Sequence, residues 1–170
     1  SGHQIMTENN IHALFQDVSS APASTAASRA VMLAGLPKGC TTMVADVTAA
    51  YLQANLKLPG DVVTWAVLPE ELRPASWSKM SCPVVPLRKA VYGHPLSGLL
   101  WQNKLEESLR KLGWETVEGW SSVFIHKATK CCMAIYVDDL LCSGPTKEVE
   151  AHLKNIGKEV VLGEAEPLSK

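Results

Sequence analysis

The chain has 170 residues, enough for one domain with a buried core, and it is 46% hydrophobic and 19% charged with a formal net charge of −1. No run of 18 apolar residues occurs and no basic segment precedes an apolar one, so neither a transmembrane helix, a membrane partner nor a secretory signal is expected. The near-zero charge argues against a general nucleic-acid binder. Five cysteines without a CxxC pair or metal spacing predict free thiols in a reducing compartment.

The N-terminal residues are polar and show neither helical nor strand periodicity. We expect residues 1–20 to form a flexible segment, part of it left over from cloning, and residues 21–170 to form the folded domain. The elements predicted for the first part of that domain are a helix from about Pro22 to Leu36, a buried strand over 42–47, a strand over 61–68, a loop over 70–83, and a short strand with a turn over 84–93.

The second half of the chain also mixes helices and strands. Leucines recur at helical spacing over 95–113 and predict an amphipathic helix that Gly113 ends. The later elements are strands over 121–127, 131–137 and 139–144, a helix from Pro145 to Gly157 with Val149, Leu153 and Ile156 on its apolar face, and a last strand over 159–162. This mixture predicts an α+β fold.

Two adjacent aspartates, Asp138 and Asp139, lie between apolar runs in the sequence Tyr-Val-Asp-Asp. A solvated hairpin turn explains them without any function, because aspartate is a good turn former. A functional interpretation needs a third carboxylate, and Asp46 supplies one at the end of another apolar strand. Three clustered carboxylates require a cation between them, and oxygen ligands select Mg²⁺ or Mn²⁺. Two such ions can hold the attacking and leaving oxygens of a phosphoryl transfer.

The motifs, taken in order, resemble a known family. VADVTAAYLQANL, PLRKAVYGHPLSGLLWQNKLEESLRKLGW, SSVFIHK and AIYVDDLLCSG are similar to the reverse transcriptase of copia-type LTR retrotransposons, over roughly Ser20 to Leu162. The resemblance implies a right-hand polymerase palm, whose antiparallel sheet carries the YVDD hairpin and is backed by helices, with partial fingers. It also implies an RNA-directed DNA polymerase that takes an RNA or DNA template–primer and deoxynucleotides. Its natural context would be a retrotransposon polyprotein in an intracellular, cytoplasmic particle.

The resemblance implies a catalytic site that holds two Mg²⁺ (or Mn²⁺) ions. Asp46 resembles the first metal-binding aspartate of the family, Asp138 the second, and Asp139 its partner in the hairpin. The backbone carbonyl of Val47 would lie near a metal.

The resemblance also implies a nucleotide-binding role for two tyrosines and a glycine. Tyr51 falls where the family places an aromatic ring that clashes with a ribose 2′-OH; the alternative is a core tyrosine after a strand. Tyr92 and Gly93 resemble the turn beneath the incoming nucleotide, where glycine permits close backbone approach; the alternative is a plain turn before the helix. Trp101, among the leucines of the predicted helix, is expected in the core rather than on a base.

The chain departs from the family pattern in three ways. Pro95 and Leu96 occupy positions where the family has Lys and Gln, which removes polar groups from the expected nucleotide site. Residues 1–28 contain no Lys or Arg, so we expect truncated fingers and an incomplete triphosphate pocket. The sequence ends at Lys170, so the thumb and an RNase H domain are expected to be absent.

These departures lead to three hypotheses. The first is a reverse transcriptase domain fragment whose activity in isolation is weak or absent. The second is a decayed or repurposed palm that acts as a non-catalytic binding or structural module. The third is a generic α+β domain with a chance Asp-Asp turn. The sequence leaves the oligomeric state and the template specificity open.

Overall fold

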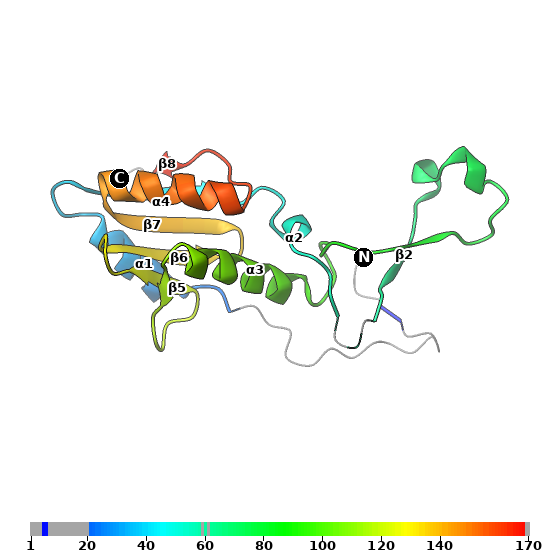
Figure 1. Ribbon diagram of the computed structural model, residues 1–170, viewed down its shortest axis with the longest axis horizontal. Coiled ribbons are helices and arrows are strands. Elements are labelled where there is room, and N and C mark those ends of the chain that lie inside the picture. Colours follow the sequence, from blue (N-terminus) through cyan, green and yellow to red (C-terminus); the bar gives the residue numbers. More distant parts are fainter. Residues whose placement is uncertain (1–4, 7–20, 59, 61, 169–170) are drawn as a thin grey trace.

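The structure, a computed structural model, describes residues 5–6, 21–58, 60 and 62–168 (Figure 1). Apart from Ile5 and Met6, the N-terminal segment for which flexibility was predicted lies outside the described residues. The described part contains a six-stranded antiparallel sheet packed with helices, together with a separate two-stranded sheet. The predicted α+β class is therefore confirmed.

The large sheet has the strand order β4-β5-β6-β7-β1-β8, and every neighbouring pair is antiparallel. Its strands are β1 (Cys40–Asp46), β4 (Glu115–Thr116), β5 (Val123–His126), β6 (Cys131–Tyr136), β7 (Asp139–Pro145) and β8 (Glu166–Pro167). The small sheet pairs β2 (Trp65–Val67) with β3 (Val84–Pro86). The helices are α1 (Thr25–Ala34), α2 (Ala50–Gln53), α3 (Ser97–Lys111) and α4 (Thr146–Glu159), and short 3₁₀ turns cover Glu70–Leu72 and Ala75–Trp77.

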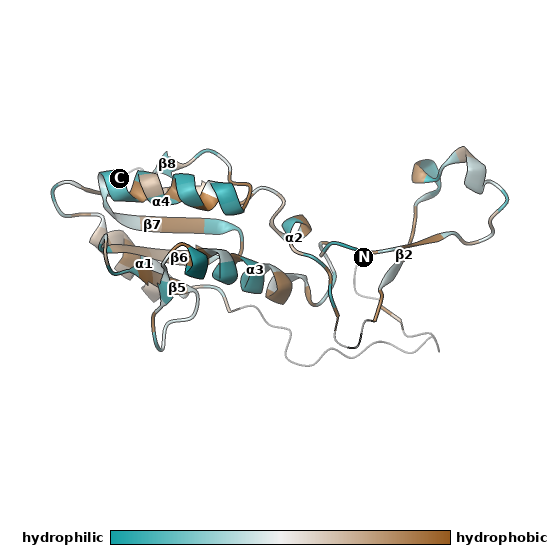
Figure 2. Ribbon diagram, in the orientation of Figure 1, coloured by the Kyte–Doolittle hydropathy of each residue, from teal (hydrophilic) through white to brown (hydrophobic). Residues whose placement is uncertain are grey.

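The helices cover the two faces of the large sheet unequally. Since residues directly opposite in an antiparallel sheet point to the same side, the row Val44, Leu141 and Ala134 marks one face, and these residues pack with α1. The other face buries a larger core beneath α3 and α4, in which Met133 and Cys142 are fully buried. Figure 2 shows the hydrophobic residues of α3 and α4 interspersed with hydrophilic ones, as expected for amphipathic helices.

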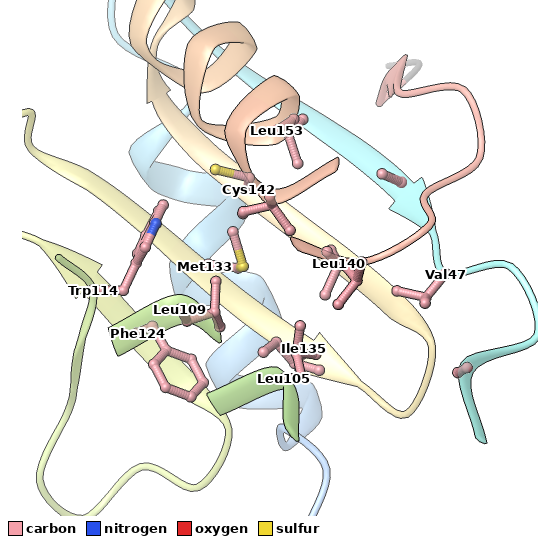
Figure 3. Packing of buried hydrophobic residues seen from close by; sticks show 14 of the residues in the cluster. Val47, Leu105, Leu109, Trp114, Phe124, Met133, Ile135, Leu140, Cys142 and Leu153 are labelled. Carbon is pink, nitrogen blue, oxygen red and sulfur yellow. The ribbon is translucent and has the colours of Figure 1, made fainter. Parts of the chain in front are cut away.

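The core beneath α3 and α4 is closely packed (Figure 3). Leu105 and Leu109 of α3 and Leu153 of α4 are almost completely buried against the central strands. Met133 and Leu140 from β6 and β7 meet them from the sheet side. This packing fixes the strands at whose ends the aspartates lie.

The small sheet forms an arm that extends away from the large sheet (Figure 1). Trp65, Val67 and Val84 on one of its faces are all roughly half exposed, at 57%, 58% and 45%. At the base of the arm, just before β2, the Thr64 hydroxyl lies 3.4 Å from Nε2 of the buried His94.

The structure corrects some of the predicted elements. The strand predicted over 61–68 forms only at β2, and the strand predicted over 159–162 is wrong, because Glu159 ends α4 and only Leu162 makes an isolated bridge, to Val47. The α4 helix runs past Gly157, since the packing of buried Ile156 and Val160 outweighs the low helix propensity of one glycine. The short elements α2, β4 and β8 were not predicted.

Candidate functional site

The β6–β7 hairpin carries the two adjacent aspartates at its tip. Tyr136 pairs with Asp139, so Val137 and Asp138 alone form the turn, and Asp139 is the first residue of β7. Val137 has φ of 58°, a conformation that a two-residue hairpin turn requires but that a β-branched residue rarely adopts. The structure therefore confirms the hairpin turn at Tyr-Val-Asp-Asp, and the turn contains a strained residue.

Pairing of β7 with β1 brings the third aspartate to this tip. Asp46 lies directly opposite Asp139, and the Val47 N–H donates to the Asp138 carbonyl at 2.8 Å. Carboxylate oxygens of Asp46, Asp138 and Asp139 all lie within 4.8 Å of one another. The sheet therefore brings Asp46 to the two adjacent aspartates, from which it is far apart in the sequence.

No protein cation neutralises this cluster among the residues that the structure describes. None of the three carboxylates takes part in an ion pair there. Burial raises the pKa of the Asp139 carboxyl above its ordinary value, and the charges of Asp138 and Asp46 raise that pKa further. Asp46 and Asp139 are exposed and Asp138 is half-buried, so the cluster is open to solvent. Close carboxylates without a cation are the donor set that hard divalent ions such as Mg²⁺ prefer.

The backbone of Val47 lies at the edge of the cluster. Its side chain is buried in the core, and its N–H donates a hydrogen bond to the Asp138 carbonyl. Val47 also forms an isolated bridge with Leu162. The Gly163 N–H donates to the Asp46 carbonyl at 2.8 Å, so the segment after α4 lies along the edge of β1 opposite to β7. The predicted role of the Val47 carbonyl as a metal ligand stays a prediction.

The structure brings the two predicted nucleotide-site tyrosines together beside the aspartates. The rings of Tyr51 and Tyr92 are 4.6 Å apart between centroids, with an angle of 51° between their planes. Partial burial raises the pKa of the Tyr51 hydroxyl, and Tyr92 and then Asp138 add to the rise. Tyr92 is 63% exposed, and Gly93 has φ of 89°, which favours glycine. Tyr51 is thus only partly a core residue.

The residues around Pro95 and Leu96 make hydrogen bonds at the start of α3. The buried His94 accepts a hydrogen bond at Nδ1 from the Leu96 N–H, at 3.2 Å. Burial lowers the pKa of His94, which favours the neutral imidazole that can accept this bond. The Ser97 hydroxyl donates to the Val91 carbonyl at 2.6 Å. These bonds fix the Tyr92–Gly93 turn to the first turn of α3.

Trp101 is a core residue, as predicted, with 2% of its surface exposed. Its indole N–H also donates to the carbonyl of Val137, at 2.8 Å. Sequence reasoning missed this second role, because periodicity predicts which face of a helix is buried but not the partner of a polar atom on that face. The presence of tryptophan among leucines was the available signal, since a buried indole N–H usually finds an acceptor.

A family model described as reverse transcriptase (RNA-dependent DNA polymerase) matches residues 8–170. The chain belongs to this reverse transcriptase family. Two yeast relatives from Saccharomyces cerevisiae, the truncated transposon Ty1-A Gag-Pol polyprotein and the transposon Ty1-DR5 Gag-Pol polyprotein, are each 32% identical over 114 residues, or 65% of this chain. These findings identify a reverse transcriptase domain of the copia-type LTR retrotransposons.

The domain spans only a small part of these relatives, 8% of the Ty1-A polyprotein and 6% of the Ty1-DR5 polyprotein. Among solved structures, telomerase from Candida albicans in complex with a fragment of telomeric RNA is similar to this chain, with a TM-score of 0.42 and 9% identity. The superposed region is 92% of this chain and 32% of the telomerase chain. Within the described residues, no helix has the length and apolar character needed to cross a membrane.

Proposed function

We propose that this domain is the palm, with part of the fingers, of an RNA-directed DNA polymerase that extends a primer 3′-OH with deoxynucleotides. The observation that carries the proposal is the convergence of three carboxylates, within 4.8 Å and without a described cation, at the tip of the hairpin of a reverse transcriptase domain. Residues 21–170 would form this unit, with the β2–β3 arm as its part of the fingers. Its partners would be an RNA or DNA template–primer and the rest of a retrotransposon polyprotein, in a cytoplasmic particle.

Asp46, Asp138 and Asp139 would hold two Mg²⁺ or Mn²⁺ ions, with the Val47 carbonyl close by. Bound there, the ions would favour the deprotonated primer hydroxyl and neutralise the leaving pyrophosphate. The carboxylates orient the reacting groups, and their mutual repulsion makes the site depend on a cation.

The two tyrosines and Gly93 would form the nucleotide side of the site. The Tyr51 ring, held against Tyr92, would occupy the space that a ribose 2′-OH needs. Exposed Tyr92 and Gly93 would lie beneath the incoming nucleotide and its template base.

We propose further that this 170-residue chain extends primers weakly by itself. Triphosphate binding relies on Lys and Arg side chains as well as metal. Pro95 and Leu96 replace the polar pair of the family at the expected nucleotide site.

The first test is Mn²⁺ binding, followed by electron paramagnetic resonance. Asp138→Asn is expected to weaken Mn²⁺ binding at least about 10-fold, since it replaces a charged carboxylate ligand with a neutral amide. Glu118→Gln is the control, because it removes an exposed carboxylate outside the cluster. Equal Mn²⁺ affinity in wild type and Asp138→Asn would contradict the metal site.

The second test is primer extension on RNA and DNA templates. We expect weak extension with Mg²⁺ or Mn²⁺ that is lost in Asp138→Asn and kept in Glu118→Gln. The alternative, a repurposed palm that binds a partner without catalysis, is favoured by the exposed apolar face of the arm at Trp65, Val67 and Val84. Metal-independent binding of a protein that is indifferent to Asp138→Asn, with no extension, would support that alternative.

A further inference from the structure

The turn that carries Asp138 is held by several separate elements of the chain. Along the hairpin, the Ile135 carbonyl accepts from the Ala23 N–H at 2.8 Å, and the Asp138 carbonyl accepts from the Val47 N–H at 2.8 Å. Between them lies the Val137 carbonyl, and it accepts from the indole of Trp101. Three carbonyls within four residues are therefore bonded to three different parts of the chain.

The bond from Trp101 acts at the strained residue of the turn. Val137 has a positive φ that a β-branched residue adopts only when its surroundings hold it there. The indole that provides this hold is itself rigid, because Trp101 is 2% exposed and packed in the core of α3. The Val137 carbonyl that accepts this bond belongs to the peptide unit between Val137 and Asp138.

The α3 helix also forms a hydrogen bond next to the Tyr92–Gly93 turn. Ser97, one helical turn before Trp101, donates its hydroxyl hydrogen to the Val91 carbonyl at 2.6 Å. Val91 directly precedes the Tyr92–Gly93 turn. Two successive turns of α3 therefore hold both the loop of Tyr92 and the hairpin of Asp138.

We infer that Trp101 is a positioning residue, whose indole N–H holds the Val137 carbonyl and thereby aims the Asp138 carboxylate at Asp46 and Asp139. The expected effect of Trp101 on metal affinity rests on the proposed function. The hydrogen bond from Trp101 to the hairpin does not depend on that function. This positioning role depends on one hydrogen bond and not on the bulk of the ring. It can therefore be tested separately from the contribution of Trp101 to the packing of the core.

The chain offers a matched control for this separation. Trp114 is also buried in the core beneath α3 and α4, at 1% exposure, but its indole Nε1 has no hydrogen-bond partner among the described residues. Trp101→Phe and Trp114→Phe each remove one indole from the same core, and only Trp101→Phe removes a hydrogen bond. Both are expected to lower the urea midpoint of unfolding.

A third variant keeps the shape of the ring. Trp101 and Val137 both line a small cavity of about 20 Å³, already large enough for one water molecule, and a phenyl ring would enlarge it further, so that water could partly replace the lost donor. Replacing Trp101 with benzothienylalanine, in which sulfur takes the place of the N–H, fills the same space without a donor. This variant remains informative if Trp101→Phe folds poorly.

The first measurement needs no metal. The amide of Val47 donates to the Asp138 carbonyl, so its hydrogen exchange, followed by NMR, reports on the hold of the hairpin. After correction for each variant's global stability, we expect exchange at Val47 to be about five- to ten-fold faster in both Trp101 variants and unchanged in Trp114→Phe. Equal corrected exchange in the Trp101 and Trp114 variants would overturn the inference.

The second measurement is Mn²⁺ affinity. Residues that orient metal ligands typically change affinity by about 10-fold or more when lost, so we expect both Trp101 variants to bind Mn²⁺ about 10-fold more weakly than Trp114→Phe. Unchanged affinity would overturn the effect of Trp101 on the site. If the wild type itself binds no Mn²⁺ at the aspartates, the proposed function fails, while the exchange rates at Val47 still decide whether Trp101 holds the hairpin.

Discussion

A single threonine hydroxyl joins two histidines at the end of the sheet away from the aspartates. Nδ1 of His126 and Nε2 of His152 each lie 2.8 Å from Oγ1 of Thr129, and the two rings are 4.3 Å apart between centroids. The hydroxyl can donate one hydrogen and accept another, so it can bond to one nitrogen of each imidazole. Because His152 belongs to α4 and Thr129 to the β5–β6 turn, these bonds hold the hairpin to the helix.

Replacing this threonine with valine keeps the shape of the side chain and removes both hydrogen bonds. Each bond contributes about 0.5–1.5 kcal/mol net, so Thr129→Val should lower the free energy of unfolding by about 1–3 kcal/mol at pH 8. Thr116→Val, at an exposed position of β4, is the control and should change it by less than about 0.5 kcal/mol. Urea unfolding followed by circular dichroism measures both. A loss below about 0.5 kcal/mol in Thr129→Val would refute this account of the cluster.

The same cluster predicts how stability depends on pH. Burial lowers the pKa of His152, His126 lowers that pKa further, and Glu148 opposes the change. With a folded pKa below the ordinary value of 6.5, the unfolded chain takes up the proton more readily. This contribution to stability is complete above pH 6.5 and is lost as the pH falls through the folded pKa. His152→Gln should flatten the decline in unfolding free energy between pH 8 and pH 5.5, and an unchanged decline would contradict the assignment.

Three further predictions test the packing and the nucleotide site. Gly35→Ala should destabilise the domain by about 1–3 kcal/mol, measured by urea unfolding, because an added Cβ would clash with Oγ1 of Thr42 and would lie 2.9 Å from the backbone C of Thr41 and the backbone N of Thr42; a neutral result would contradict this tight contact. Leu109→Ala, at 0% exposure, should cost about 2–5 kcal/mol, whereas Leu33→Ala, at 64% exposure, should cost less than about 0.5 kcal/mol; similar losses would contradict the assignment of the core. Tyr51→Ala should raise ribonucleotide relative to deoxynucleotide incorporation about 10-fold in primer extension, and an unchanged ratio would favour a core role for this tyrosine.

Much of the fold could be predicted from hydrophobic periodicity. The α3 and α4 helices each bury a face of leucines or other apolar residues, so their 3.6-residue pattern is visible in the sequence. The hydrophobic runs of β5, β6 and β7 were likewise predicted, because they form the buried centre of the sheet. Where an element is long and packs against one core, its local sequence is enough.

The elements that were missed are short and depend on distant partners. The strands β4 and β8 have two residues each, too few to show periodicity, and they exist because they pair with β5 and β1. The predicted strand over 159–162 was wrong for a related reason: Val160 is buried as the chain leaves α4, Val161 is exposed, and Leu162 makes only an isolated bridge with Val47.

For the site, the sequence by itself determined the chemical groups: the adjacent aspartates, a third aspartate after another apolar strand, and motifs similar to a reverse transcriptase. Only the tertiary structure decided that Asp46 lies opposite Asp139 and that the indole of Trp101 reaches the carbonyl beside Asp138. Strand register and the partner of a buried donor follow from how the whole core packs, and no local pattern encodes either one. The residue types were therefore readable from the chain, whereas their convergence was a property of the fold.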